Sequence, residues 1–257
     1  MIRQNQTSRM TALGGSGCRS ILGLARIVAY KVLCVLGLIT VCQVSAQPVS
    51  LSAIQAFENE VAAVASALPG AAAVLVIAGE PRPLMLHGFQ SLEDITPVGP
   101  KTTFQLASLS KSMAAAGVNA SISDMRQWLL AQFGLIEGLS EAVRERLHNR
   151  YVIASREASH YPEDRRILSV GYGLGWRTFS FGGIEGFFHH GGYVQGMRSE
   201  MIFHPDSASG LVFLTNSEPA RLNRLSLRFA EWWAENGHLS DRSHESVGRR
   251  DEASALE

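Results

Sequence analysis

The chain has 257 residues, 46% of them hydrophobic, which is enough for one large domain or two small ones around a packed core. Lys and Arg together number 23, and Asp and Glu also number 23, so the formal net charge is zero. This composition excludes a disordered chain, disfavours a general nucleic-acid binder and favours a small molecule or a peptide as the partner.

The N-terminal segment, residues 1–46, has the pattern of a signal peptide. Arg26 and Lys31 precede an apolar run from Val32 to Val41, and Val44-Ser45-Ala46 then offers small residues at a cleavage point. The run is too short to cross a bilayer as a stable helix, so we expect cleavage and no stable membrane anchor. The mature protein is therefore expected in the periplasm or outside the cell.

The cysteines all precede that cleavage point, at Cys18, Cys34 and Cys42. The mature chain then has no thiol, which excludes disulfides and cysteine catalysis there. Lipidation of Cys42 is disfavoured because the bulky Val41 comes directly before it. Met10 is an alternative start for this long leader.

The first part of the mature chain predicts a helix and a hairpin. Apolar residues recur every three or four positions from Leu51 to Leu68, which is typical of one helix face, and Pro69-Gly70 ends that pattern. Residues Ala71 to Ile77 and Pro83 to Phe89 then read as two strands joined by a tight turn at Gly79-Glu80-Pro81.

Two further helices follow. The composition from Ser108 to Ala116 favours a helix that starts near Ser108. Ser121 lies three residues before Asp124, the spacing of a capping box, and the apolar face that follows ends at Gly134. From Glu137 to Arg166 charged residues dominate, which predicts helix and loop with a solvated face.

The C-terminal part predicts an antiparallel meander covered by a helix. Short runs at Tyr172 to Phe181, Gly186 to His190, Met197 to His204 and Gly210 to Asn216 are separated by Gly-Gly, Gly-Gly-Tyr and Pro-Asp turns. An amphipathic helix is expected from Ala220 to Asn236, and residues 238–257 form a polar tail. The domain at 47–237 is therefore predicted to be an α/β sandwich, an antiparallel sheet flanked by helices, with strands from both ends of the chain.

Ser108 and Lys111 are the first candidate catalytic pair. They lie three residues apart, so at a helix start their side chains share one face. A lysine that is partly removed from water can be neutral and accept the serine proton, and the helix N-terminus supplies N–H groups to an oxyanion. The alternative is a chance pairing, since serine is common.

The segment His190-Gly191-Gly192-Tyr193 is the candidate substrate-binding strand. Its glycines allow a ligand to lie along the strand, His190 is a candidate for holding a substrate carboxylate, and the Tyr193 N–H can join that of Ser108 at an oxyanion. A zinc site at His189 and His190 is disfavoured because neighbouring strand residues point to opposite faces, and no metal or cofactor is expected. The simpler alternative is a polar strand end.

Taken together, four blocks resemble the serine β-lactamase-like hydrolases, in particular the class C β-lactamase and DD-peptidase branch. The blocks are Phe104-Gln105-Leu106-Ala107-Ser108-Leu109-Ser110-Lys111, Gly117 to Met125, Tyr172-Gly173-Leu174-Gly175-Trp176 and His190 to Gly196. The resemblance implies a β-lactamase/transpeptidase-like sandwich, with Ser108 as nucleophile and Lys111 as its proton partner. It also implies His190-Gly191-Gly192 as the variant of the family's Lys-Thr-Gly strand motif.

The chain departs from that family in its middle. Only Ser112 to Ala116 separate Lys111 from Gly117, where the family inserts most of a helical subdomain, and no Tyr-x-Asn or Ser-x-Asn motif occurs between Lys111 and His190. The proton-relaying third group is thus missing, and core surface is expected to face water and invite self-association. The open hypotheses are a serine hydrolase with impaired activity towards a β-lactam, a D-alanyl peptide or an ester; an inactive ligand-binding remnant; and a scaffold that dimerises through the exposed surface.

Overall fold

The computed structural model describes residues 48–91, 93, 95–113, 117–154, 161, 164–218 and 223–237. The predicted signal segment 1–46 and the predicted tail 238–257 lie outside these ranges. Within them, no helix is both long and apolar enough to cross a membrane.

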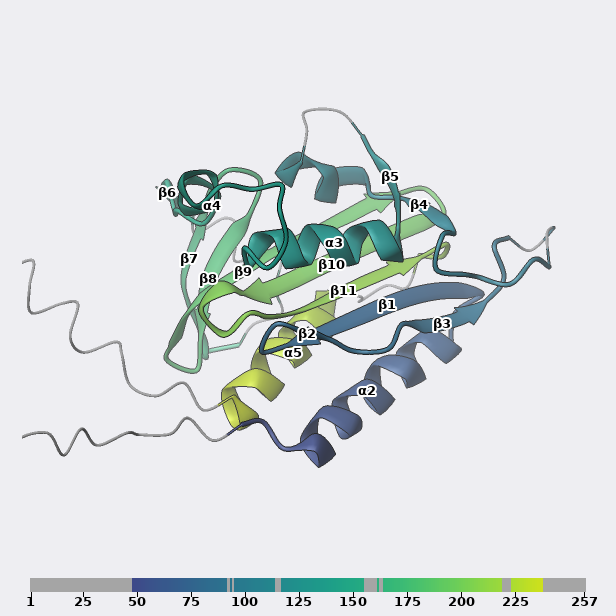
Figure 1. The fold of residues 1–257 in the computed structure, drawn as a ribbon, viewed down its shortest axis with the longest axis horizontal. Coiled ribbons are helices and arrows are strands. Elements are labelled where there is room, and N and C mark those ends of the chain that lie inside the picture. The colour runs from purple at the N-terminus through teal and green to yellow at the C-terminus, as the bar shows by residue number, and fades with distance from the viewer. Residues whose placement is uncertain are drawn as a thin grey trace, which may run out of the picture. The chain divides into compact units, whose positions relative to one another are not determined.

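The described residues form one large antiparallel sheet with helices on both of its faces (Figure 1). Its path is β2-β1-β11-β10-β9-β8-β7-β6, and β3 also pairs with β1. The strands are β1 (Gly70–Ile77), β2 (Glu80–Pro81), β3 (Met85–Gly88), β6 (Val152–Ile153), β7 (Ile167–Tyr172), β8 (Arg177–Phe181), β9 (Ile184–Val194), β10 (Met197–His204) and β11 (Ser209–Thr215). The predicted α/β sandwich, with strands from both ends of the chain, is confirmed.

The helices cover the two faces unequally. One face carries α2 (Leu51–Ser66) and α5 (Asn223–Asn236). The other carries α3 (Ile122–Gln132), the short 3₁₀ helix η1 (Ala107–Ser112) and a two-stranded sheet of β4 (Thr103–Gln105) and β5 (Asn119–Ser121). A helix α4 (Glu141–Leu147) follows, and a 3₁₀ turn η3 (Pro205–Ser207) joins β10 to β11.

Strand β1 shows why the central strands are apolar throughout. Its Ala71, Ala73 and Leu75 pack in the core beneath α2 and α5. Ala72 and Val74 pack in the separate core with η1 and α3. Because both faces are covered, every residue of β1 is buried and the sequence has no polar alternation there.

The two best-marked helix starts are confirmed. Ser50 caps α2 by accepting from the Ala53 backbone N–H, and Ser121 caps α3 in a complete capping box with Asp124. The Ser121 N–H and hydroxyl donate to the Asp124 carboxylate, which lowers the pKa of that carboxyl. A capping box satisfies two backbone donors that the helix leaves open, which fixes where α3 begins.

The structure corrects three local predictions. Tyr172 to Phe181 is not one strand: β7 ends at Tyr172, β8 begins at Arg177, and Gly175 turns the chain between them with a φ of +81°. Gly191-Gly192-Tyr193 is not a turn either, because β9 continues through it to Val194. The charged segment supplies not only a helix but also strand β6, and β7 begins directly after it; exposed positions in both strands hid their strand character.

The link between η1 and β5 is short. η1 ends at Ser112 and β5 begins at Asn119, so six residues, 113–118, join them. The predicted helix from Ser108 to Ala116 is shorter than expected and of the 3₁₀ type, and residues 114–116 lie outside the described ranges. The predicted start near Ser108 is confirmed, since η1 begins one residue earlier.

Candidate active site

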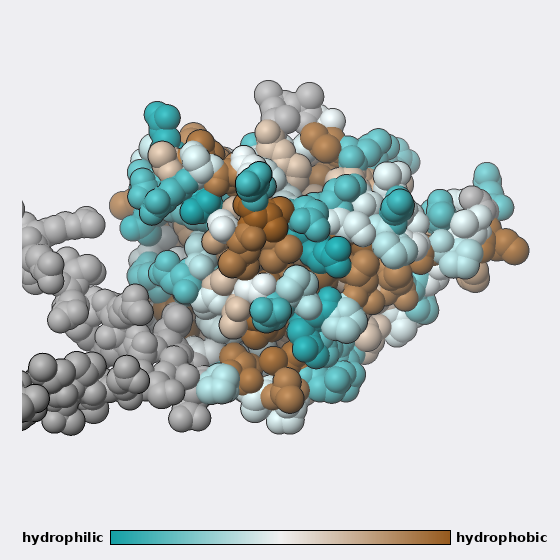
Figure 2. All heavy atoms as spheres, viewed as in Figure 1, coloured by the Kyte–Doolittle hydropathy of each residue, from teal (hydrophilic) through white to brown (hydrophobic). Residues whose placement is uncertain are grey.

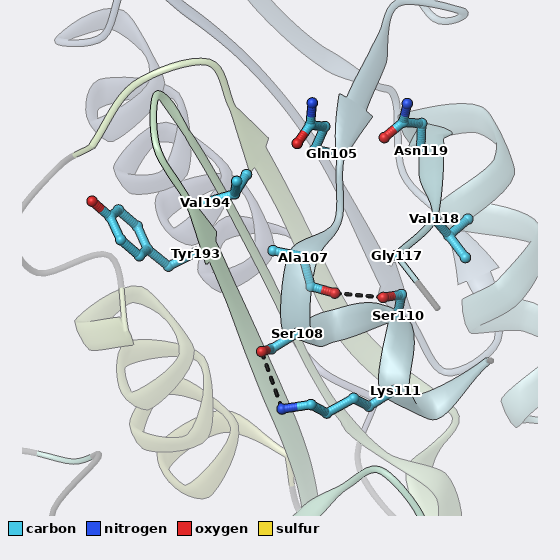
Figure 3. Close-up of a pocket in the computed structure, with 10 residues that line it drawn as sticks. All are labelled: Gln105, Ala107, Ser108, Ser110, Lys111, Gly117, Val118, Asn119, Tyr193 and Val194. Carbon is cyan, nitrogen blue, oxygen red and sulfur yellow. Dashed lines mark hydrogen bonds between the residues drawn. The ribbon is translucent and has the colours of Figure 1, made fainter. Parts of the chain in front are cut away.

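The Ser108 and Lys111 side chains meet on one side of η1. Lys111 Nζ lies 3.2 Å from Ser108 Oγ, a hydrogen bond that the sequence spacing predicts (Figure 3). Ser108 is half-buried, whereas Lys111 is exposed. An exposed lysine is not desolvated in the way that the sequence argument assumes, so the pair is assembled but the lysine remains in contact with water.

The residue before the serine has a strained backbone. Ala107 has a φ of +49°, in the left-handed region that side chains other than glycine rarely adopt. Such a conformation costs about 1–3 kcal/mol and persists only where the surroundings impose it. Here it turns the chain sharply out of β4 and directs Ser108 into the space above β9.

Two glycines, one in strand β9 and one in the β7–β8 turn, let η1 approach closely. A Cβ at Gly192 would lie 2.0 Å from the Leu106 carbonyl oxygen, just before η1. A Cβ at Gly175 would lie 2.6 Å from the Lys111 carbonyl oxygen. The glycines of the strand motif and of the β7–β8 turn therefore make room for the chain's own backbone, and η1 is positioned between them.

A pocket of about 510 Å³ opens beside the pair. Figure 3 shows the residues that line it, which come from η1, the two-stranded sheet, the short link and the end of β9. They are Gln105, Ala107, Ser108, Ser110, Lys111, Gly117, Val118, Asn119, Tyr193 and Val194. The pocket thus contains both predicted catalytic residues and the far end of the predicted substrate-binding strand.

His190 lies behind this pocket rather than in its wall. The ring is only 1% exposed; its Nδ1 donates to the Gly191 carbonyl at 2.8 Å, and its Nε2 lies 3.0 Å from the Tyr172 hydroxyl. Burial, aided by the positive charge of Arg177, lowers the pKa of His190 to about 3. The neutral ring has both nitrogens engaged, so this geometry offers no N–H for the substrate carboxylate that the sequence analysis assigns to His190.

The neighbouring His189 points to the opposite face, as the alternation of strand side chains predicts. Its Nε2 lies 2.6 Å from Glu200 Oε2, and its Nδ1 lies 3.0 Å from the Tyr161 hydroxyl. Both His189 and Glu200 are buried. This polar network is a structural feature on the α5 side of the sheet that the sequence analysis does not foresee.

The Tyr193 side chain also faces away from Ser108, and so would a side chain at Gly191. The Tyr193 ring is exposed and points away from Ser108 (Figure 3). Its hydroxyl donates to Glu218 at 3.0 Å. A Cβ at Gly191 would lie 2.6 Å from the Glu200 carboxylate. The part of Tyr193 that remains available to a ligand near Ser108 is its backbone.

The sequence analysis misses Gln105 and Asn119 as pocket residues. They pair across the β4–β5 ladder, and both are exposed. The signal is present in the sequence, because Gln105 is the polar residue between Phe104 and Leu106 in an alternating run. The partner strand at Asn119 could not be recognised from so short a segment.

Comparisons with known proteins place this site in a family context. The β-lactamase family model matches residues 113–230, a stretch that begins two residues after Lys111 and includes β9. The solved structure of an octameric penicillin-binding protein homologue from Pyrococcus abyssi is similar with a TM-score of 0.56 and 10% sequence identity. That similarity covers 71% of this chain and 76% of that one. No curated protein matches the sequence.

Proposed function

We propose that the chain is a serine hydrolase that works through an acyl-enzyme at Ser108, a proposal supported by the match of residues 113–230 to the β-lactamase family model and by a fold similar to that of a penicillin-binding protein homologue. The observation that carries the proposal is the 3.2 Å contact between Ser108 Oγ and Lys111 Nζ at the wall of a pocket. A nucleophile within hydrogen-bond reach of a base is the basic requirement of covalent acyl transfer.

The proposed reaction has two halves. Ser108 Oγ attacks the carbonyl carbon of the substrate while its proton passes to the neutral form of Lys111. The bond from that carbon to the leaving oxygen or nitrogen then breaks, and the leaving group takes the proton back from Lys111. Water repeats the sequence on the acyl-enzyme, releases the acid and restores Ser108.

Two backbone N–H groups are proposed to stabilise the oxyanion, those of Ser108 and Tyr193. The register Val194↔Met197 closes a two-residue hairpin at Gln195-Gly196, so the next pair, Tyr193↔Arg198, is of the type that does not exchange hydrogen bonds. The Tyr193 N–H is then directed away from β10. The pairing of β8 with β9 begins only at Arg177↔His189, so β8 does not cover this end of β9.

Turnover is proposed to be slow. Among the described residues that line the pocket, Lys111 is the one basic side chain, and the Tyr193 hydroxyl is turned towards Glu218. A second proton-transfer group contributes about 10²–10⁴-fold in such enzymes. The exposure of Lys111 is expected to lower the rate further. These two features favour the second candidate function, a ligand-binding remnant that does not turn over a substrate.

The test is acylation of the purified protein by a fluorophosphonate probe and, separately, by a β-lactam, followed by intact-mass measurement. The proposal expects one adduct per chain and its loss in Ser108→Ala. Ser110→Ala is the matched control, because the Ser110 hydroxyl lies on the same helix but donates to the Ala107 carbonyl. A folded protein without any adduct leaves the ligand-binding remnant as the better account.

We also propose that residues 1–46 direct export and are removed, so that the site works in the periplasm or outside the cell. The support is the charged, apolar and small-residue pattern of the sequence alone. Mass measurement of the exported protein tests this: a chain that begins near Gln47 agrees with it, and a retained N-terminus contradicts it.

Self-association is proposed through the face that carries α3. A groove of about 490 Å³ lies there, lined largely by apolar residues that include Met113, Trp128 and Ile136. Figure 2 shows hydrophobic patches interrupting the hydrophilic surface on this face. The similar penicillin-binding protein homologue is itself octameric. Light scattering over a range of concentrations checks the proposal, and a monomer at every concentration contradicts it.

A further inference from the structure

The pocket beside Ser108 carries little charge. Among the described residues that line it, Lys111 carries the only formal charge near neutral pH. The remaining polar side chains are the Gln105 and Asn119 carboxamides and the hydroxyls of Ser108, Ser110 and Tyr193. A substrate that enters this pocket therefore meets one cation at most.

In the proposed reaction, Lys111 acts as a base and not as a partner for an anion. In the proposed reaction Lys111 must be neutral when it accepts the proton of Ser108, from which it lies 3.2 Å away. A neutral amine cannot at the same time balance the negative charge of a substrate carboxylate. A substrate with a carboxylate beside the scissile bond would keep Lys111 in its charged form and suppress the base.

Neither His190 nor Arg198 replaces it. His190 is buried, with both ring nitrogens engaged by Gly191 and Tyr172. The Arg198 guanidinium lies over the Tyr193 ring, 5.7 Å from its centre and 4.0 Å from the Glu200 carboxylate. Among the described pocket residues, a carboxylate brought next to Ser108 would find only Lys111 as a charged partner, and that pairing would withdraw the base from the reaction.

The uncharged polar groups are arranged to receive a ligand instead. Gln105 and Asn119 stand opposite each other in the β4–β5 ladder, and Figure 3 shows their side chains together at one rim of the pocket. Within the part of the chain that the structure describes, neither carboxamide has a hydrogen-bond partner, and both are exposed. Each amide offers both a donor and an acceptor to a neutral group.

We propose that the pocket accepts acyl donors that carry no charge beside the scissile bond, uncharged esters above all, and rejects donors with a carboxylate there. Gln105 and Asn119 then act as specificity-determining residues that contact uncharged polar groups of the donor. This inference rests on the proposed acyl-enzyme function of Ser108 and narrows its substrate class.

The experiment compares two matched esters, 3-acetoxybenzamide and 3-acetoxybenzoate, which differ in the charge of the leaving group. Acylation of Ser108 in the full chain is followed by intact mass, with the fluorophosphonate probe as a separate check of the nucleophile. The benzamide ester is expected to acylate about tenfold faster or more, since a carboxylate would hold Lys111 in its charged form and suppress the base. Equal rates, or a faster benzoate ester, overturn the inference and leave the acyl-enzyme function intact.

A variant tests the same point by supplying the missing charge. Asn119→Lys is expected to raise the benzoate rate relative to the benzamide rate, whereas Asn119→Gln, which keeps an uncharged amide, preserves the preference. An unchanged ratio in Asn119→Lys counts against the inference.

Binding provides a readout that does not depend on turnover. In Ser108→Ala, titration followed by NMR is expected to show that the benzoate ester, unlike the benzamide ester, shifts the signals of the Lys111 side chain, because its carboxylate pairs with that amine. If the fluorophosphonate probe leaves no adduct, the acyl-enzyme function fails, and this inference fails with it. If the probe reacts but the benzoate ester leaves the Lys111 signals unshifted, only the inference fails.

Discussion

The two faces of the sheet differ in how completely they are covered. On the face of α2 and α5, aromatic residues interlock: the Phe57 ring stacks on Trp232 at 5.0 Å and tilts against Phe229 at 6.1 Å. On the opposite face, a six-residue 3₁₀ helix and the single helix α3 lie over the sheet, joined by the short link at 113–118. The first face is a closed core, whereas the second holds a pocket of about 510 Å³ and an apolar groove of about 490 Å³.

The difference shows which part of the molecule maintains the fold and which part carries the chemistry. The closed face buries large rings that need no partner beyond the chain itself. The open face also has a buried core, which includes Leu106 and Leu109, but close backbone approaches at Gly192 and Gly175 add to the positioning of Ser108 there. Changes on the closed face should therefore affect stability first, and changes on the open face should affect acylation first.

The largest effect is expected from Phe57→Ala. Phe57 is 1% exposed and lies in the aromatic cluster, so its removal leaves a cavity and should lower the free energy of unfolding by about 3–5 kcal/mol. Urea unfolding measures this. Trp128→Ala, on the half-buried edge of the open face, should cost less, and an equal cost for both would contradict the contrast between the two faces.

The next effect is expected from Gly192→Ala. The new methyl group would be forced against the Leu106 carbonyl oxygen, and overpacking of this kind costs about 1–3 kcal/mol. Because the strain is relieved by moving η1, acylation of Ser108 should fall more than stability does. The rate of fluorophosphonate labelling checks this, with Gly99→Ala as the control because its added Cβ has ordinary contacts. Labelling at the normal rate in Gly192→Ala would count against the positioning role.

The smallest effect is expected from His190, whose burial makes the free energy of unfolding depend on pH. In the unfolded chain this ring binds a proton near pH 6.5, but burial lowers its folded pKa to about 3. As the pH falls from 6.5 towards 3, the unfolded state gains protons first, so stability is lost; above 6.5 the contribution is intact.

Between the two pKa values, one such histidine changes the free energy of unfolding by about 1.4 kcal/mol per pH unit. Urea unfolding at pH 7 and pH 5 measures it, and His190→Gln should flatten the dependence by that amount. A slope that does not change in this variant would show that His190 does not remain uncharged in the folded protein.

Patterns among residues close together in the sequence were sufficient to predict most of the helices and strands. The spacing from Leu51 onwards, the Ser121–Asp124 capping box and the three-residue separation of Ser108 and Lys111 each depend on neighbours in sequence, and each corresponds to an observed feature. The predicted turn at Gly191-Gly192 was wrong, and the turn between Tyr172 and Arg177 was missed. A glycine that admits a distant backbone and one that turns the chain look alike in sequence.

The sequence by itself therefore determined the sandwich, the helix starts and the candidate nucleophile with its lysine, because periodicity, capping and i to i+3 spacing are local properties. Only the tertiary structure decided that Lys111 is exposed, that His190 is buried behind the pocket and that Gln105 and Asn119 share its rim. These properties depend on which segments pack together across the sheet. Burial and pairing between residues far apart in the chain leave no local pattern from which they could have been read.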